Sequence, residues 1–566
     1  YVESNQEALD TVLQAYKIAE NQRILLPTMV SLDGFYLSFS SEIVSLPSQE
    51  EIDAFLPPYR SNHAILDPAD PMALYCEAVV PIHYERLIEE AMGRARQVIQ
   101  EVKEDFSARF GRSYGLAEAY GCEGAEVVLV TVGSMTGTAR EVIDTFRSQG
   151  KSVGLLKLRT LRPFPTEELW EIARNAKVLA VIDRNVSYGA GGGCGVVCLD
   201  VKAALYDLSQ RPKVINLIAG YGGLDITEEI ISNFLDEALM VVKNGRAGQG
   251  TNWVLPPLPT THGVIPEDAE ERVVYPGTPS CAGCSAALFF RNTLEFLGRD
   301  VCLIMPPGCL SVVNTVGWPG YSPVKLPFFM ATFAATASTA SGVRAGLDAL
   351  GKEDNLVVGI AGDGGTADIG LQSLSGAANR QDRLLYICYD NEAYMNTGIQ
   401  KSGTTAFGAR TTTPVDEVMQ GNPLVAKDVP RIMAAHDVPF IATASVAYLE
   451  DYRKKLAKAV QMVKEQKRMA YLHIHAPCAT GWRFPPEKTI EVARLAVETG
   501  LWPLYEIEEG CYTHNRKLKN PKPVAEYIKL QGRFRHLSPE QLQILQDLAD
   551  QRVSWLKSLE EQNKGE

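Results

Sequence analysis

The sequence predicts a multidomain α/β protein built on doubly wound parallel sheets. The chain has 566 residues, several times the length of a usual domain, so several well-buried cores are expected. Short apolar segments alternate with segments of helical periodicity through most of the chain. Glycine-rich turns follow several of the apolar segments. This alternation is typical of parallel strands that are covered by helices on both faces.

Composition and charge narrow the class of protein. Apolar residues make up 46% of the chain and charged residues 22%, close to the averages of ordered globular proteins. The net charge of -13 and the lack of a lysine or arginine cluster argue against a nucleic-acid surface. No apolar run is long enough to predict a membrane span, and the first residues lack the pattern of a secretory leader. We therefore expect a cytoplasmic protein.

The N-terminal half divides into two predicted domains. In the first, residues 1–119, a helix is expected over 5–19, an apolar strand over 23–31 and a long amphipathic helix over 82–106. The second, residues 120–243, contains a regular strand and helix alternation. Its expected strands are 126–132, 152–158 and 177–183, and its expected helices are 138–149 and 166–175. We expect a parallel sheet there.

The C-terminal half follows a predicted linker. Residues 244–269 are rich in glycine, proline and threonine and have no hydrophobic periodicity, which is typical of a linker. Residues 270–512 resume the strand and helix alternation and form the largest predicted domain. Residues 513–566 are predicted to form a helical extension.

Two polar clusters in this largest domain follow neighbouring apolar strands. The strand expected over 356–361 runs into Gly362-Asp363-Gly364-Gly365. A helix is expected over 369–379, and the next strand, 384–389, ends in Asp390-Asn391. Because the carboxyl ends of parallel strands form the ligand-binding edge of an open α/β sheet, both clusters should meet at that edge.

The residue types suit a phosphate bound through a divalent cation. Asp363 and Asn391 provide hard oxygen ligands, and the three glycines leave room for phosphate oxygens beside backbone N–H groups. A glycine-rich turn with a capping aspartate is the structural alternative for such a motif. The strand context and the position of Asn391 favour the metal site.

This pattern resembles the GDG-to-Asn motif of thiamine diphosphate enzymes. The resemblance implies that Asp363, Asn391 and the backbone carbonyl of Ala393 hold Mg²⁺. It also implies that Gly362, Gly364 and Gly365 bind the diphosphate.

Four of the eleven cysteines form a second constellation. Cys281 and Cys284 form a C-x-x-C pair, Cys309 follows them, and Cys478 stands far along the chain. Four thiolates can complete either a structural zinc site or a four-iron four-sulfur cluster, and spacing alone does not choose. The other seven cysteines are expected to be buried small apolar residues: Cys76, Cys122, Cys194, Cys198, Cys302, Cys388 and Cys511.

The cysteine segments resemble the β subunit of pyruvate:ferredoxin oxidoreductase over about residues 270–510. The matching segments are Cys281 to Cys284, Pro306-Pro307-Gly308-Cys309, 389–400 and 476–482. The resemblance implies that Cys281, Cys284, Cys309 and Cys478 ligate one 4Fe-4S cluster beside the thiamine. It also implies that Asn396 acts at the substrate end of the cofactor, and that Cys309 and Thr397 lie against the cofactor.

Residues 1–240 resemble the later part of the α subunit of the same family. The specific matches are 25–35 and Phe55-Leu56-Pro57-Pro58-Tyr59, and residues 124–223 are similar to a transketolase-C-terminal-like domain. The resemblance implies that residues 1–119 are the C-terminal part of a domain of the pyrimidine-binding type. The glutamate that activates thiamine in this family is then expected upstream of Tyr1, on another polypeptide or lost.

The resemblance implies oxidative decarboxylation of a 2-oxoacid, with pyruvate converted to acetyl-CoA and CO₂ as the favoured case. Coenzyme A would accept the acyl group, and electrons would pass through the cluster to ferredoxin. The implied partners are ferredoxin-like δ-type and γ-type subunits in an oligomer. Oxalate or a branched-chain 2-oxoacid is the alternative substrate. A non-redox thiamine decarboxylase or synthase, or a zinc-binding assembly subunit, is the alternative class of protein.

Overall fold

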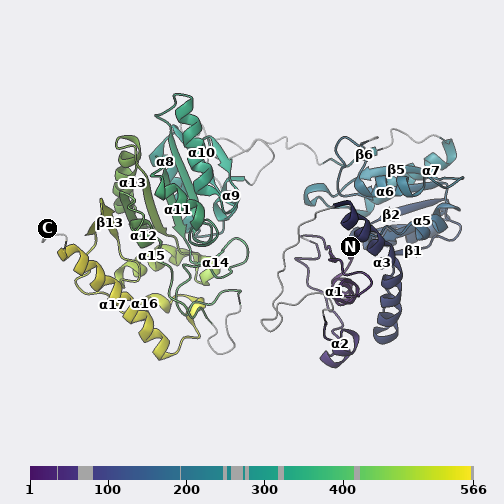
Figure 1. Ribbon diagram of the computed structural model, residues 1–566, viewed down its shortest axis with the longest axis horizontal. Coiled ribbons are helices and arrows are strands. Elements are labelled where there is room, and N and C mark those ends of the chain that lie inside the picture. Colours follow the sequence, from purple (N-terminus) through teal and green to yellow (C-terminus); the bar gives the residue numbers. More distant parts are fainter. Residues whose placement is uncertain are drawn as a thin grey trace. The chain divides into compact units, whose positions relative to one another are not determined.

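Two parallel-dominated sheets organise the chain, one in each of two units, Tyr1–Thr261 and His262–Glu566. This computed structural model describes residues 1–34, 36–60, 81–190, 193–245, 251–255, 272–274, 280–315, 324–413 and 421–562. In each unit, helices lie against the sheet (Figure 1). The predicted multidomain α/β fold is confirmed.

The N-terminal unit contains a six-stranded sheet of order β1-β3-β2-β4-β5-β6, parallel except for the β1 and β3 pair. Its strands are β1 (Ala117–Tyr120), β2 (Val127–Thr131), β3 (Val153–Leu158), β4 (Val178–Asp183), β5 (Lys213–Ile218) and β6 (Thr251–Trp253). Its helices are α1 (Asn5–Ala19), α2 (Gln49–Phe55), α3 (Pro81–Phe110), α4 (Met135–Ser148), α5 (Thr166–Ala173), α6 (Val196–Ala204) and α7 (Glu228–Asn244). Residues of α4 and α7 pack on one face of this sheet, and residues of α5 and α6 pack on the other.

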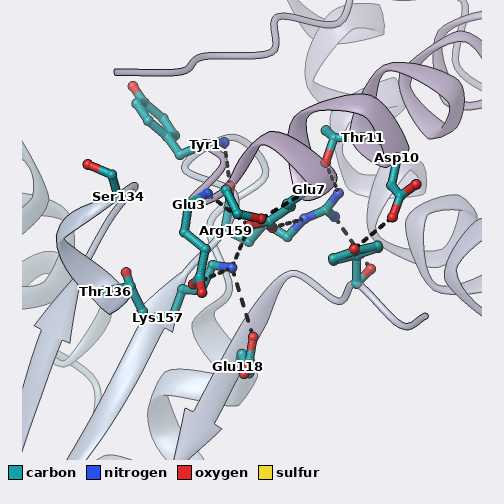
Figure 2. A network of polar contacts seen from close by, with 12 residues as sticks. Tyr1, Glu3, Glu7, Asp10, Thr11, Glu118, Ser134, Thr136, Lys157 and Arg159 are labelled. Carbon is teal, nitrogen blue, oxygen red and sulfur yellow. Dashed lines mark hydrogen bonds and ion pairs between the residues drawn. The ribbon is translucent and has the colours of Figure 1, made fainter. Parts of the chain in front are cut away.

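A buried network of charges joins α1 to the end of β3 (Figure 2). Glu7, only 2% exposed, accepts hydrogen bonds from Lys157 Nζ at 2.7 Å and Arg159 Nε at 3.0 Å. Burial lowers the pKa of the Arg159 guanidinium, although the Glu7 carboxylate opposes that shift. Without Glu7, Lys157 and Arg159 would be buried cations with one counter-charge fewer, which is costly. The contact therefore holds α1 against the sheet.

The C-terminal unit contains an eight-stranded sheet of order β14-β13-β11-β12-β10-β9-β7-β8. Neighbours run parallel from β11 to β8, whereas β13 is antiparallel to both β11 and β14. The strands are β7 (Val301–Met305), β8 (Phe328–Met330), β9 (Leu356–Gly362), β10 (Leu385–Asp390), β11 (Phe440–Ser445), β12 (Ala470–His475), β13 (Tyr505–Glu508) and β14 (Cys511–His514). β9 and β10 are buried and adjacent, as the sequence predicts.

Two apolar layers cover this sheet. Residues of α8 and α13 belong to the cluster on one face, and residues of α10, α11 and α12 to the cluster on the other. The helices of the unit are α8 (Ser285–Leu297), α9 (Cys309–Thr315), α10 (Thr336–Ala349), α11 (Leu371–Asn379), α12 (Val429–Ala434), α13 (Leu449–Lys464), α14 (Ala479–Trp482), α15 (Thr489–Glu498), α16 (Val524–Ile528) and α17 (Pro539–Gln562). The last two form the predicted helical C-terminal region, drawn at the yellow end of the chain in Figure 1.

Two element predictions differ from the structure. The strand expected over 23–31 is wrong, because this segment is a turn followed by irregular chain. Leu25 has a left-handed φ of 49°, and Pro27 lacks the N–H that a sheet ladder requires. Part of the segment predicted as a linker, Thr251–Trp253, is instead strand β6 at the edge of the first sheet. The predicted domain boundaries themselves stay a prediction.

The cysteines outside the predicted cluster are less uniform than expected. Cys194, Cys198 and Cys388 are buried, whereas Cys122 and Cys302 are half-buried. Cys511 contradicts the prediction, because it is exposed on edge strand β14. Cys76 lies outside the described residues.

Within the described ranges, each helix is too short or too polar to span a lipid bilayer.

Candidate active site

The carboxyl ends of β9 and β10 bring the two predicted polar clusters together. Tyr389 pairs with Gly362 in the parallel ladder, so Asp363 and Asn391 follow neighbouring strand ends. The backbone N–H of Asn391 donates a hydrogen bond to Oδ1 of Asp363 at 3.3 Å. The two residues therefore meet at the edge where the sequence places a ligand site.

Three oxygen atoms converge at this point. The side-chain oxygen of Asn391 lies 3.0 Å from the carbonyl oxygen of Ala393 and 3.2 Å from Oδ1 of Asp363. The amide nitrogen of Asn391 in turn faces only donors, so rotating the amide satisfies both of its ends in the empty site. In the unrotated orientation, the three oxygens would be ligands for a cation. Neighbouring ligands of an octahedral Mg²⁺ with bonds of about 2.1 Å are about 3.0 Å apart. The spacing therefore fits Mg²⁺.

Asp363 is held in place by two hydroxyl groups. Its Oδ2 accepts a hydrogen bond from Ser402 Oγ at 2.5 Å and another from Thr404 Oγ1 at 3.1 Å. The carboxyl group is 1% exposed. Burial, and then the neighbouring Asp390 carboxyl group, raise the pKa of Asp363 well above its ordinary value. A bound cation would offset both effects.

A cavity of about 210 Å³ opens beside these oxygens. The residues that line it include every predicted thiamine-site residue: Cys309, Gly362, Asp363, Gly364, Gly365, Asn391, Ala393, Asn396 and Thr397. At Gly364 a Cβ atom would lie 2.7 Å from the ring of Tyr394, which is closer than a side chain tolerates. The motif therefore needs glycine there, because the Tyr394 ring packs directly against its backbone.

The four predicted cluster cysteines line a second cavity, of about 310 Å³. Cys284 caps the N-terminus of α8 and Cys478 that of α14, each with its Sγ accepting a backbone N–H. Cys309 begins α9. The pKa of the Cys309 thiol is raised to about 12, mainly by burial. The neighbouring groups of Cys478, Cys284, Asp363 and Cys281 raise it further by smaller amounts. Three segments that are far apart in sequence thus bring the four thiols to one cavity.

The arrangement of these cysteines bears on the choice between zinc and a cluster. A zinc ion would draw its four sulfur ligands onto one point. Among the described residues, no three His, Cys, Asp or Glu side chains are grouped closely enough to hold a single ion. The four cysteines line one cavity instead.

The two cavities share a wall. Cys309, Asn391, Met395 and Asn396 line both of them. Asn396 is exposed at this wall, and the hairpin that carries it is closed by the Tyr394 and Gln400 bridge. A group in the first cavity would therefore lie next to a group bound by the cysteines.

Sequence reasoning missed three residues at this site. Ser402 and Thr404 hold Asp363, and the indole Nε1 of Trp482 donates to the carbonyl of Asn391 at 2.9 Å. The polar run at 402–405 was a weak signal for the first two. Trp482 lies in a segment that matches the family, but no spacing rule ties its indole to a carbonyl 91 positions away.

Family models match three parts of the chain: "Pyruvate flavodoxin/ferredoxin oxidoreductase, thiamine diP-bdg" over residues 1–104, "Pyruvate:ferredoxin oxidoreductase core domain II" over 125–231, and "Thiamine pyrophosphate enzyme, C-terminal TPP binding domain" over 308–474.

Curated relatives match about half of the chain over nearly their whole length. Pyruvate synthase subunit PorB of Methanothermobacter thermautotrophicus is 48% identical over 286 residues, which are 50% of this chain and 96% of the relative. Ketoisovalerate oxidoreductase subunit VorB of Pyrococcus abyssi is 44% identical over 312 residues, 52% of this chain and 98% of the relative. A solved 2-oxoglutarate:ferredoxin oxidoreductase from Magnetococcus marinus is 18% identical, covering 43% of this chain and 84% of its own, with a TM-score of 0.31.

Proposed function

The chain belongs to the 2-oxoacid:ferredoxin oxidoreductases, a family of thiamine diphosphate-dependent enzymes, and from that premise we propose that it oxidatively decarboxylates pyruvate to acetyl-CoA and CO₂. In this proposal the electrons leave through one 4Fe-4S cluster held by the chain itself. Coenzyme A is the acyl acceptor.

One observation carries the proposal. A cavity beside three converging oxygens and a cavity lined by four cysteines share a wall that includes Cys309. A non-redox thiamine enzyme needs only the first cavity, and a zinc-bound assembly subunit needs only the cysteines. An oxidoreductase needs both, because electrons removed from the substrate must reach an acceptor close by.

We assign roles to the residues of the first cavity. Asp363, the side chain of Asn391 and the carbonyl of Ala393 would hold Mg²⁺. Gly362, Gly364 and Gly365 would border the diphosphate, with Cys309 and Thr397 beside the cofactor. When bound, thiamine diphosphate supplies the electron sink for decarboxylation.

Asn396 is our candidate catalytic residue. Its side chain is exposed at the wall that both cavities share, so it can reach a substrate in the first cavity. An amide there can donate a hydrogen bond to a carboxylate or carbonyl oxygen. We propose that it orients the 2-oxoacid.

Four thiolates would hold the cluster. Cys281, Cys284, Cys309 and Cys478 line its cavity. Iron binding would deprotonate the thiols, and burial otherwise raises the pKa of Cys284, Cys309 and Cys478. The relatives' names mark them as subunits, which supports an assembly with other chains. We propose that a ferredoxin-like δ-type subunit, a γ-type subunit and ferredoxin carry the electrons onward. We place the enzyme in the cytoplasm, where thiols are kept reduced.

A branched-chain 2-oxoacid is the second candidate substrate. The relative named for ketoisovalerate is 44% identical, only slightly less than the relative named for pyruvate at 48%. Electron transfer to ferredoxin with pyruvate and with 2-ketoisovalerate, measured on the same oxygen-free preparation of the assembled enzyme, distinguishes them. A higher kcat/KM for 2-ketoisovalerate would assign the branched-chain substrate.

The cofactor content tests the class of enzyme. We expect protein purified without oxygen to contain about four irons and four sulfides per chain, with Mg²⁺-dependent binding of thiamine diphosphate. Zinc without iron or thiamine would support an assembly subunit. Thiamine without iron would support a non-redox enzyme.

A further inference from the structure

A left-handed residue lies between two of the proposed metal donors. Glu392 has a φ of 58° and separates Asn391 from Ala393. A non-glycine residue in this region is strained and persists only when its surroundings hold it there. The conformation matters, because it turns the Asn391 side chain and the Ala393 carbonyl toward the same point.

Buried contacts hold Glu392 in this turn. Its Oε2 lies 2.7 Å from Nη1 of Arg533, with the two side chains 10% and 3% exposed. Its N–H donates to Oδ1 of Asp390 at 2.8 Å, and its carbonyl accepts from Thr405 Oγ1 at 2.7 Å. Arg533 lies in the 3₁₀ helix η5 (Gly532–Phe534). A segment distant in sequence therefore fixes residues 391–393, which we call the metal loop.

Trp482 connects this turn to the cysteine cavity. Its Nε1 donates to the carbonyl of Asn391 at 2.9 Å, and the Arg533 guanidinium lies 3.5 Å from the centre of its ring. Trp482 ends α14, whose N-cap is Cys478. One short helix therefore has a proposed cluster ligand at one end and the contact to the metal loop at the other.

We propose that Trp482 and Arg533 are positioning residues that couple the two sites, so that occupancy of the cysteine cavity strengthens binding of Mg²⁺ and thiamine diphosphate, and the reverse. The inference rests on the proposed function. A cluster fixes Cys478 and with it α14, and α14 fixes the turn at Glu392 through Trp482. Because coupling between two binding sites is reciprocal, each ligand must stabilise the other by the same factor.

Neither residue lines the two cavities. Their effect must therefore pass through the loop from Asn391 to Ala393 and through α14. Trp482 and Arg533 therefore act on the position of the ligand residues and not by direct contact with either cofactor. It also means that substitution should leave the ligand atoms themselves in place.

The chain offers a matched control for Trp482. Trp502 also donates its Nε1 to a backbone carbonyl at 2.9 Å, that of Ala444, and both indoles pack on His475. Only Trp482 contacts the metal loop. Trp482→Phe and Trp502→Phe therefore lose the same kind of bond at different places.

The first measurement is the Kd of thiamine diphosphate with Mg²⁺, by calorimetry on oxygen-free protein that retains its iron but has been depleted of thiamine diphosphate. We expect Trp482→Phe to weaken binding about tenfold with full iron content, and Trp502→Phe to leave the Kd unchanged. Arg533→Met, compared with the exposed Arg535→Met, repeats the test should Trp482→Phe fold poorly. Equal affinities in Trp482→Phe or Arg533→Met and in the wild type would overturn the inference.

The second measurement tests the coupling from the cluster side. Iron release to a chelator is timed with and without Mg²⁺ and thiamine diphosphate. We expect the cofactor to slow release several-fold in the wild type and in Trp502→Phe but hardly in Trp482→Phe. Equal slowing in all three would mean that the cofactor merely shields the cluster. A wild type that binds neither iron nor thiamine would instead refute the proposed function.

Discussion

The side-chain oxygen of Asn391 lies 3.2 Å from Oδ1 of Asp363 and 3.0 Å from the carbonyl oxygen of Ala393. An ionised carboxylate repels such neighbours unless a cation or a rotated amide lies between them. The contact therefore makes the metal site testable by single substitutions that keep the shape of the side chains.

Asp363→Asn should abolish Mg²⁺-dependent binding of thiamine diphosphate. The change removes a charged metal ligand but keeps the volume of a side chain that is 1% exposed. We expect the affinity for Mg²⁺, measured by calorimetry with saturating thiamine diphosphate, to fall at least about a hundredfold. Iron content should not change in protein that has not met a chelator. A variant with wild-type metal affinity would remove Asp363 from the ligand set.

Ser402→Ala should weaken the same site by a smaller factor. Ser402 Oγ donates to Asp363 Oδ2 at 2.5 Å, so its loss frees the carboxylate to turn away from the metal. Partners of metal ligands typically contribute 10- to 100-fold in affinity, and we expect about tenfold weaker binding of Mg²⁺. The exposed Ser338, whose Oγ donates to the carbonyl of Ala335 at the N-cap of α10, provides the control as Ser338→Ala. Equal effects of the two changes would contradict the role of Ser402.

The strand pattern made the metal-site residues predictable. The same reasoning could not predict the residues that hold them in place. Gly362 ends β9, and Asp363 and Asn391 directly follow β9 and β10, so local sequence places them on one sheet edge. Ser402 reaches Asp363 across 39 positions through a loop whose path depends on tertiary packing. The strand expected over 23–31 failed for a related reason, since apolar residues there find no strand to pair with. The four cysteines were grouped by resemblance, because their spacing fits zinc equally well.

Cys309→Ser should weaken thiamine diphosphate binding more than Cys281→Ser does. Cys309 lines both cavities, and Cys281 lines only the cysteine cavity. We expect both variants to lose iron, measured with sulfide and by electron paramagnetic resonance on oxygen-free protein. Only Cys309→Ser should also weaken thiamine diphosphate binding beyond the loss caused by the missing cluster. Cys302→Ser, half-buried on β7, is the control and should keep its iron. Unchanged iron in Cys309→Ser would exclude this residue as a ligand.

His475 should make the C-terminal unit sensitive to acid. Burial, and then Arg533 and His473, lower the pKa of His475 from 6.5 to about 3, and neither ring nitrogen has a hydrogen-bond partner among the described residues. In the unfolded chain, His475 therefore takes up a proton near pH 6.5, whereas in the folded chain it is protonated only near pH 3. Between these values, stability falls as the pH falls, by about 1.4 kcal/mol per pH unit for this group.

His475→Phe removes that proton while keeping an aromatic ring between Trp482 and Trp502. We expect the slope of unfolding free energy against pH, measured by urea unfolding between about pH 6 and pH 4.5, to decrease by about 1.4 kcal/mol per unit. Hydrogen exchange at β12 assigns the change to this unit. The exposed His83 on α3, changed to Gln, should leave the slope as it is. The same slope in His475→Phe and the wild type would mean that water or a neighbouring charge already stabilises the protonated ring, and the burial argument would then fail.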